Sequence, residues 1–347
     1  MNDLRLRSIP VIGPQREAAQ LEGSKAFAKA FMQRHHIPTA SYAVFNKTQI
    51  DEAKRYLLTL TPPYVLKADG LSAGKGVVIL NTVSEAYAEL DEMLAHSKFG
   101  KASDTVVIEQ FLTGIELSVF VLTDGHSYKI LPSAKDYKRV GDHDTGLNTG
   151  GMGAVSPVPF ASEAFMNKVE QRIVRPTIDG LQTDGIPYQG FLFIGLMDVN
   201  DEPYVIEYNV RLGDPETEAI LPRIQSDLLQ LFKSVVTQQL HTETLQIDPR
   251  YAVCVMLTAA GYPEHYEKGY RLHFAEASSD ALIFHAGTKQ MADDQLCSNG
   301  GRVVAITTLG NTLQEAIDTT YQQVKTVDFE GRYHRTDIGY DLLPYTK

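Results

Sequence analysis

Residues 64–80 read YVLKADGLSAGKGVVIL, a glycine-rich loop between two apolar runs with a lysine on either side of the turn. Val65 and Leu66 predict a strand that delivers Lys67, and Lys75 lies at the tip of the loop as a point positive charge. Small residues in the loop let backbone amides approach bound oxygens without interference from a Cβ atom. They are Gly70, Ala73, Gly74 and Gly76. The stretch therefore predicts a clamp for nucleotide phosphates.

Two familiar phosphate-binding patterns do not fit this stretch. The phosphate loop of many NTPases requires Gly-Lys-Ser/Thr and then a helix, whereas Lys75 is followed by Gly76 and Val77 begins a predicted strand. The dinucleotide-binding fingerprint also requires a helix after its turn. A glycine-rich hairpin with surface lysines is the alternative interpretation of the loop taken alone. The other motifs of the chain favour a lysine-bearing loop that covers a nucleotide.

The composition is that of a soluble globular chain with two or three domains. Of its 347 residues, 43% are hydrophobic, and the formal net charge is −11 from 32 basic and 43 acidic residues. This charge argues against nucleic acid or an anionic membrane as the main partner. Cys254 and Cys297 are too few for a disulfide framework and lack metal-ligand spacing, and no apolar run reaches the length of a membrane span. We therefore expect a cytoplasmic protein.

Hydrophobic periodicity predicts a mixed α/β (α+β) fold. The predicted strands are residues 42–45, 64–67, 76–80, 105–111, 116–122, 128–131, 189–199, 203–208, 252–259, 281–286 and 302–308. The predicted helices are residues 15–34 with a break near Gly23, 50–60, 84–96, 162–182 and 226–240, and a helix from Thr312 where Glu315 completes a capping box. Residues 139–153, RVGDHDTGLNTGGMG, are too irregular for either element, so we expect a long functional loop.

A second strong motif is VIEYNVRLGDPETEAILPR, residues 205–223. Side chains two apart in a strand share a face, so Glu207, Asn209 and Arg211 are predicted to point the same way. A carboxylate and an amide oxygen suit a hard divalent cation, and Arg211 suits a phosphate or carboxylate. A half-exposed strand with an ion pair is the alternative for this triplet alone. Asp214 and Glu216 favour the cation, because several close carboxylates are costly unless cations neutralise them.

Two further segments suit contacts with nucleotide and substrate. In EQFLTGIELSVFVL, residues 109–122, Glu109 ends one predicted strand and Glu116 begins the next, so the connection between them can pair with an adenine edge while Glu116 accepts from ribose hydroxyls. On its own this segment is a common hairpin. Residues 134–153 mix Lys135, Lys138 and Arg139 with acidic residues and glycines, which suits either a substrate-phosphate contact or a solvated loop.

Together these segments resemble the ATP-grasp ligases and, within them, the phosphoribosylamine–glycine ligase (glycinamide ribonucleotide synthetase) family. The matching strings cover nearly the whole chain: IGPQREAAQLEGSKAFAKAFM, VLKADGLSAGKGVVI, EQFLTGIELSVF, KDYKRVGDHDTGLNTGGMGAVSPVP, VIEYNVRLGDPETEAILPR, HAGT, NGGRVVAIT and GRYHRTDIGYD. The resemblance implies an ATP-grasp fold with a small C-terminal α/β module. It also implies ligation of 5-phosphoribosylamine to glycine through glycyl phosphate, giving glycinamide ribonucleotide, ADP and phosphate in purine synthesis.

The resemblance also assigns roles to individual residues. It implies that ATP is held at its phosphates, its adenine and its ribose by Lys67, Gly74, Lys75, Gly76, Glu109, Gln110, Phe111, Leu112 and Glu116. It implies that Mg²⁺ or Mn²⁺ is held by Glu207 and Asn209. The candidates for organising the acyl phosphate and the substrates are Lys138, Arg139, Arg211 and Asp214. The expected partners are glycine, 5-phosphoribosylamine and ATP, without nucleic acid or membrane, and the expected state is a monomer or a homodimer.

The family begins with a Rossmann-like domain that we expect to be absent here, because the chain starts just before the helix predicted at residues 15–34. The predicted division is a residual linker at 1–14, an ATP-grasp domain at 15–245 with a nucleotide-clamp subdomain at 62–125, and a C-terminal domain at 246–347. One alternative is a truncated, catalytically impaired nucleotide-binding remnant. Another is an ATP-grasp relative with a different acid or amine substrate, which GDPETEAILPR and DHDTGLNTGGMG argue against.

Overall fold

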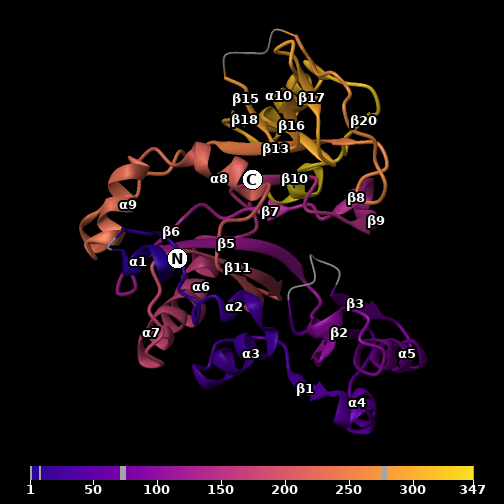
Figure 1. Cartoon of the computed structure of the whole chain (residues 1–347). Helices are drawn as coiled ribbons and strands as arrows, with labels where there is room; N and C mark the ends of the chain where they lie inside the picture. Colours follow the sequence, from indigo (N-terminus) through magenta and orange to yellow (C-terminus); the bar gives the residue numbers. More distant parts are fainter. Residues whose placement is uncertain (1, 8, 71–75, 276–279, 347) are drawn as a thin grey trace.

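The computed structural model describes residues 2–7, 9–70, 76–275 and 280–346. Within these residues three larger sheets, with helices packed on them, make up most of the fold (Figure 1). The chain begins with the short helix α1 (Asn2–Leu6) and then runs past the end of the central sheet, where Gly13 N donates to Gln189 O at 2.7 Å. In the described part of the chain no helix is both long and apolar enough to cross a membrane.

The first sheet carries the strands on either side of the glycine-rich loop. Its antiparallel order is β1 (Tyr42–Asn46), β4 (Thr105–Gln110), β2 (Tyr64–Ala68) and β3 (Val77–Leu80). Helices α4 (Ile50–Leu57) and α5 (Val83–Leu94) bury one face of this sheet, and Thr82 and Glu85 form a complete capping box at the start of α5. The predicted clamp subdomain at 62–125 differs from this unit, because β1 and α4 precede residue 62.

The central sheet has the order β12 (Glu202–Asn209), β11 (Gly190–Val199), β5 (Ile115–Thr123) and β6 (Tyr128–Ile130). Side chains alternate between its faces. Leu117, Val119 and Val121 pack with α2 (Gln20–Gly23), α3 (Lys25–Arg34), α6 (Glu163–Val169), the π-helical turn η4 (Glu170–Val174) and α7 (Arg175–Thr183). Phe120 and Leu122 pack on the other side with α8 (Glu216–Ile220) and α9 (Leu228–Val236).

The third sheet combines two parts of the chain. Its order is β15 (Leu282–His285), β18 (Arg302–Gly310), β13 (Tyr251–Ala259), β10 (Gly153–Ser156) and β7 (Lys135–Asp136), with β20 (Arg332–Tyr333) paired to β13. Helix α10 (Leu313–Val324) covers it. The predicted capping box of α10 is incomplete, because the Glu315 carboxylate accepts from Asn311 N at 2.7 Å and not from Thr312 N. Strands β7 and β10 tie the middle of the chain to its C-terminal module.

The prediction that residues 139–153 lack regular structure is wrong. They form the hairpin of β8 (Arg139–Gly141) and β9 (Thr145–Asn148), with the 3₁₀ turn η3 (Asp142–Asp144) between them, and they end at the start of β10. The remaining pairs are β14 (His273–Phe274) with β19 (Val327–Asp328) and β16 (Thr288–Gln290) with β17 (Leu296–Ser298). The remaining 3₁₀ turns are η1 (Lys47–Gln49), η2 (Gly100–Ser103), η5 (Leu221–Arg223), η6 (Leu240–Thr242) and η7 (Tyr340–Tyr345).

Candidate functional site

A polar cleft of about 480 Å³ lies where α2 and α3 face the ends of β2, β4 and β12. Six of the sequence-predicted site residues meet there: Lys67, Gly76, Glu109, Glu207, Asn209 and Arg211. The other lining residues are Leu21, Glu22, Lys25, Ala28, Lys29, Met32, Val77, Ile206 and Tyr208. The cleft therefore joins the glycine-rich loop region to the E-x-N-x-R motif, which lies about 140 positions further along the chain.

Glu109 holds two buried lysines on one side of the cleft. Its Oε1 lies 2.9 Å from Lys67 Nζ and its Oε2 lies 2.9 Å from Lys29 Nζ, and all three side chains are almost fully buried. Burial alone would raise the pKa of Glu109, but Lys67 and Lys29 outweigh it and keep that pKa below its ordinary value. Burial lowers the pKa of Lys29 to about 8, against the opposing attraction of Glu109. Glu109 is therefore an ionised counter-charge for a cationic pair.

Lys25 and Lys29 are the cleft residues that the sequence interpretation missed. They lie four apart on α3, so both point to one side of that helix. Lys25 Nζ donates to Ala68 O at 2.9 Å at the end of β2, and burial lowers its pKa although Glu207 opposes the shift. The spacing in SKAFAK was the available signal, because two lysines one turn apart form a cationic face on a helix whose other residues are apolar as far as Met32.

The E-x-N-x-R motif lines the opposite wall of the cleft. Asn209 Nδ2 lies 3.4 Å from Glu207 Oε1, and Arg211 Nη2 donates to Asn209 Oδ1 at 3.1 Å. Strand β12 ends at Asn209, yet Arg211 still faces the cleft, where its Nε lies 3.2 Å from Glu22 Oε1. The predicted shared face of these three side chains is confirmed by these contacts. Tyr208 also borders the cleft, although its ring is buried in the core below.

The predicted adenine and ribose residues lie mostly outside the described lining of this cleft. Gln110 ends β4, and its backbone N donates to Ser41 O at 2.9 Å, while Phe111 and Leu112 form the half-buried connection to β5. Glu116 turns away to Lys138, whose Nζ lies 2.5 Å from Glu116 Oε2. Gly74 and Lys75 lie outside the described residues. The nucleotide-base contacts stay a prediction.

A second charged cluster surrounds Lys138. Lys138 Nζ lies 3.9 Å from Asp136 Oδ1, and Ser118 Oγ donates to Glu216 Oε1 at 3.3 Å. Burial raises the pKa of Asp136, and burial together with Asp136 raises the pKa of Glu216 to about 7. Burial would lower the pKa of Lys138, but Asp136 and Glu116 outweigh that effect and raise it. A buried carboxyl that titrates near neutral pH thus lies in the same network as the Lys138 ammonium group.

The remaining predicted catalytic residues do not join either cluster directly. Asp214 Oδ1 lies 2.9 Å from Arg302 Nη1, so it faces the C-terminal module, whereas the buried Glu216 carboxylate accepts from Ser118 Oγ. Arg139 Nη1 donates to Gly146 O at 2.7 Å inside the β8–β9 hairpin. The side chains of these four residues thus make different contacts: Lys138 with Glu116, Arg139 within the β8–β9 hairpin, Arg211 in the cleft and Asp214 with the C-terminal module.

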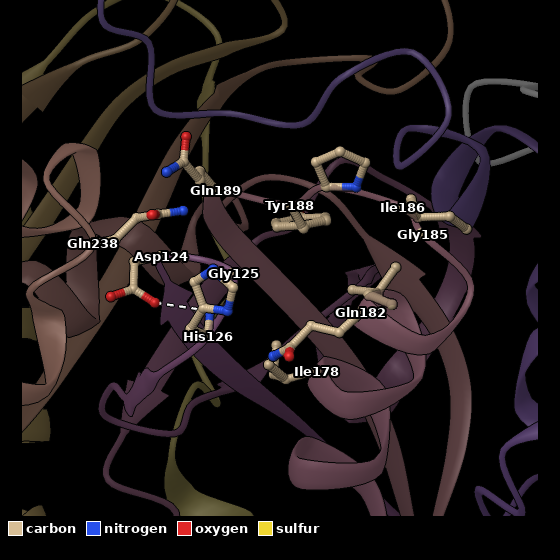
Figure 2. Close-up of a pocket in the computed structure, with 12 residues that line it drawn as sticks. Asp124, Gly125, His126, Ile178, Gln182, Gly185, Ile186, Tyr188, Gln189 and Gln238 are labelled. Atoms are coloured by element: carbon tan, nitrogen blue, oxygen red, sulfur yellow. Dashed lines mark hydrogen bonds between the residues drawn. The ribbon is translucent and has the colours of Figure 1, made fainter.

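A second cavity of about 440 Å³ lies between the β5–β6 turn and the end of α7 (Figure 2). Asp124 lies at its edge, and its Oδ1 accepts from His126 N at 2.9 Å and from Ser127 N at 2.7 Å, while its Oδ2 accepts from Leu240 N at 3.1 Å. Asp124 is the one carboxylate among the residues that line the cavity, and both of its oxygens already accept hydrogen bonds from the backbone. None of the sequence-predicted site residues that the structure describes lines this cavity.

Family models match the two parts of the chain. The phosphoribosylglycinamide synthetase ATP-grasp (A) domain matches residues 23–217, and the C domain of the same synthetase matches residues 252–341. The chain belongs to the phosphoribosylglycinamide synthetase family. As a member of this family it is an ATP-grasp ligase, and the predicted α+β fold class is confirmed.

Individual relatives agree with this family. The phosphoribosylamine–glycine ligase of Chlorobaculum tepidum is 46% identical over 347 residues, a match covering 99% of this chain and 81% of the relative. A bifunctional purine biosynthetic protein of Pichia angusta is 46% identical over 335 residues, and this chain spans 42% of its length. The crystal structure of the Thermotoga maritima phosphoribosylamine–glycine ligase has a TM-score of 0.87 and 38% identity, covering 94% of this chain and 81% of that chain.

A more distant structure shows the fold alone. The crystal structure of a biotin carboxylase–β,γ-ATP complex from Campylobacter jejuni has a TM-score of 0.73 at 17% identity, covering 98% of this chain and 74% of that chain. The fold of this chain is thus shared by a protein that differs widely from it in sequence.

The residues in the cleft fit the ATP and the divalent cation that the phosphoribosylglycinamide synthetase family uses. Glu207 and Asn209 contribute carboxylate and amide oxygens, the ligands that hard cations prefer. Among the described residues no three His, Cys, Asp or Glu side chains are grouped to hold a metal. This pair therefore suits a cation that takes its other ligands from phosphate oxygens and water, as Mg²⁺ does at nucleotides.

Proposed function

We propose that this chain ligates glycine to 5-phosphoribosylamine at the expense of ATP, giving glycinamide ribonucleotide, ADP and phosphate in purine biosynthesis. In the proposed reaction a glycine carboxylate oxygen attacks the γ-phosphorus of ATP and ADP leaves, which forms glycyl phosphate. The amine of phosphoribosylamine then attacks the glycyl carbon, phosphate leaves with the bonding electron pair, and the nitrogen releases a proton to give the amide. The observation that carries the proposal is the cleft that unites Lys67, Glu109, Glu207 and Asn209 in a chain of this family.

The lysines of the cleft supply the positive charge that nucleotide phosphates require. Lys25, Lys29 and Lys67 converge on the cleft from α3 and β2, and in the proposed complex Lys75 approaches from the loop. Because Glu109 already pairs with both Lys67 and Lys29, a bound phosphate enters a site whose lysines are held in place before binding. Such preorganised charges stabilise a transferring phosphoryl group without reorganisation during the reaction.

Glu207 and Asn209 are the proposed ligands of Mg²⁺ or Mn²⁺. When bound there, the cation polarises the transferring phosphoryl group and orients it. Arg211 lies beside Asn209 and is paired with Glu22, so its guanidinium is fixed at the edge of the cleft, where it can hold a carboxylate or an acyl phosphate. Lys138, Arg139 and Asp214 remain proposed substrate contacts on neighbouring elements.

Two broader features complete the proposal. Cys254 and Cys297 are both buried free cysteines, which suits the reducing cytoplasm in which we place this enzyme. We also propose a monomer or a homodimer that acts on small molecules alone.

The test is ADP release from the purified chain, given ATP, Mg²⁺, glycine and freshly generated phosphoribosylamine, with ATP binding followed by calorimetry. Release that depends on both glycine and phosphoribosylamine is expected. ADP release with another amino acid in place of glycine, and not with glycine, would show a different acid substrate. ATP binding without turnover would instead favour a catalytically impaired nucleotide-binding chain.

A further inference from the structure

A segment near the C-terminus holds the hairpin that follows Lys138. Figure 1 shows β8 and β9 against the C-terminal module, on the side of β20. Thr336 N and Oγ1 donate to the two carboxylate oxygens of Asp142 at 2.8 and 2.6 Å, across 194 positions of sequence. Tyr333 Oη donates to Val140 O at 2.9 Å. Residues 333–336 therefore form hydrogen bonds with both β8 and the η3 turn.

Arg335 is the centre of this contact. Its side chain is only 1% exposed, and its Nη1 donates to Asp144 Oδ1 at 2.7 Å and to Arg139 O at 3.2 Å. Its Nε and Nη2 donate to the two oxygens of Asp337, each at 2.8 Å. Only the planar fork of an arginine can hold one carboxylate at two atoms while it reaches a second carboxylate and a carbonyl.

The same contacts hold an unusual backbone in the η3 turn. His143 and Asp144 both have positive φ, 56° and 53°, which costs energy for residues other than glycine. His143 N donates to Asp337 Oδ2 at 2.8 Å, and the Asp144 carboxylate is paired with Arg335. The turn therefore depends on the C-terminal segment for its conformation.

Lys138 lies between two residues that Arg335 contacts. The guanidinium carbon of Arg335 lies 5.1 Å from the centroid of the Tyr137 ring, and Arg335 also binds the carbonyl of Arg139. Tyr137 is buried, and its hydroxyl donates to Asp341 Oδ1 at 2.5 Å. The Lys138 side chain itself reaches out to Glu116.

We infer that Arg335 is a positioning residue for the proposed ligation. It contacts the Tyr137 ring on one side of Lys138 and the Arg139 carbonyl on the other, and thereby places the Lys138–Glu116 pair relative to the reacting groups. This inference rests on the proposed function for its catalytic readout. A purely structural arginine would instead stabilise the C-terminal module without a specific effect through Lys138.

The variants are Arg335→Met, Arg335→Lys and Lys138→Met, with Arg332→Met as the matched control. Arg332 lies on the same segment, but its Nη1 donates to Val324 O and Val327 O within the C-terminal module. A further variant, Asp142→Asn, weakens the hydrogen bonds between the hairpin and Thr336 while Arg335 remains. Each variant is assayed for kcat and KM with glycine and phosphoribosylamine, for ATP affinity by calorimetry, and for amide exchange of residues 139–148.

We expect Arg335→Met to lower kcat/KM by about 100-fold, because small displacements of a positioning group have effects of that size. ATP affinity is expected to change less than about threefold, since Arg335 does not line the cleft. Arg335→Lys should recover part of the activity, and Asp142→Asn should give a smaller loss. In the Lys138→Met background Arg335→Met should cause little further loss, because residues that act through one another are non-additive. Arg332→Met should stay within about twofold of the wild type.

Equal kcat/KM in Arg335→Met and the wild type would overturn the inference, and so would fully additive effects of Arg335→Met and Lys138→Met. A parallel fall of activity and ATP affinity would mark a general structural role and overturn it as well. A wild-type chain without substrate-dependent ADP release would refute the proposed function separately. In that case, unchanged exchange of residues 139–148 in Arg335→Met would refute the positioning of the hairpin, and faster exchange would support it.

Discussion

Replacing Glu109 with glutamine leaves two buried lysines without their counter-charge. The substitution keeps the size of the side chain but removes the carboxylate that lies 2.9 Å from both Lys29 Nζ and Lys67 Nζ. At an effective dielectric constant of about 20, each such contact corresponds to roughly 6 kcal/mol of attraction before desolvation is counted. Measured losses after one partner of a buried pair is removed are smaller, about 3–5 kcal/mol. We therefore expect Glu109→Gln to lose about 4 kcal/mol of unfolding free energy at pH 7.

This loss depends on pH through Lys29. The pKa of Lys29 in the folded chain is about 8, below the ordinary lysine value of 10.5, because burial disfavours its charged form. Between these two values the unfolded chain binds more protons than the folded one, so stability rises with pH in that window. Without Glu109 the folded-state pKa falls further, and the window opens at a lower pH. The destabilisation by Glu109→Gln is therefore expected to be smaller at pH 9.5 than at pH 7.

Urea unfolding at both pH values measures these differences, and thermal unfolding at pH 7 should show a midpoint lowered by roughly 10 °C. The matched control is Glu89→Gln, which removes the carboxylate 2.7 Å from Lys98, a lysine with 41% of its side chain exposed. That change should cost less than about 1 kcal/mol. Equal losses in the two variants, or a loss in Glu109→Gln that does not shrink with pH, would refute the account of a buried charge cluster.

Other outcomes follow from the two clusters. Glu207→Ala should weaken ATP binding about tenfold or more in Mg²⁺ and little in EDTA, as calorimetry in the two buffers will show. The unfolding midpoint should not change, because the Glu207 side chain is exposed. ATP affinity should fall as pH rises through about 8, where Lys29 loses its proton, and Lys29→Met should lose this dependence. The raised Glu216 pKa of about 7 means that the folded chain binds more protons than the unfolded chain between about pH 4.5 and 7, so stability falls across that range. The contribution of Glu216 to the unfolding free energy should fall by roughly 2–3 kcal/mol between pH 5 and pH 8, and Glu216→Gln should lack this decrease. Urea unfolding at both pH values measures the difference.

The sequence predicted the wall of the cleft formed by β12 because that wall depends on local geometry alone. Strand alternation places Glu207 and Asn209 on one face whatever the rest of the chain does. Lys25 and Lys29 carry an equally local signal, a one-turn spacing on a helix. A lysine pair on a helix usually faces solvent, and here only tertiary contacts turn the two side chains into the cleft: Lys29 Nζ lies 2.9 Å from Glu109 Oε2 on β4, and Lys25 Nζ donates to Ala68 O at the end of β2.

The parts that depend on strand register could not be predicted. Val65 lies opposite Glu109 in the β2–β4 pair, so Lys67 is the diagonal neighbour of Glu109 on the same face. A shift of one residue would send these side chains to opposite faces, and nothing local in either strand fixes the register. The β8–β9 hairpin was missed for a related reason. Its glycine-rich sequence has little periodicity, and its conformation depends on contacts with residues 333–337 near the other end of the chain.

The net charge of −11 and the affinity for a polyanion proposed here are compatible because the cleft separates local charge from total charge. Exposed carboxylates more than about 10 Å away are largely screened at ordinary salt, whereas buried groups are screened much less. Lys29 and Lys67 are almost fully buried, so their attraction for a phosphate is set by Glu109 and the few groups around them. ATP binding should therefore depend less on ionic strength than binding to exposed lysines would, since counter-ions have limited access to this pair. A steep salt dependence would instead place the main phosphate contacts on exposed side chains.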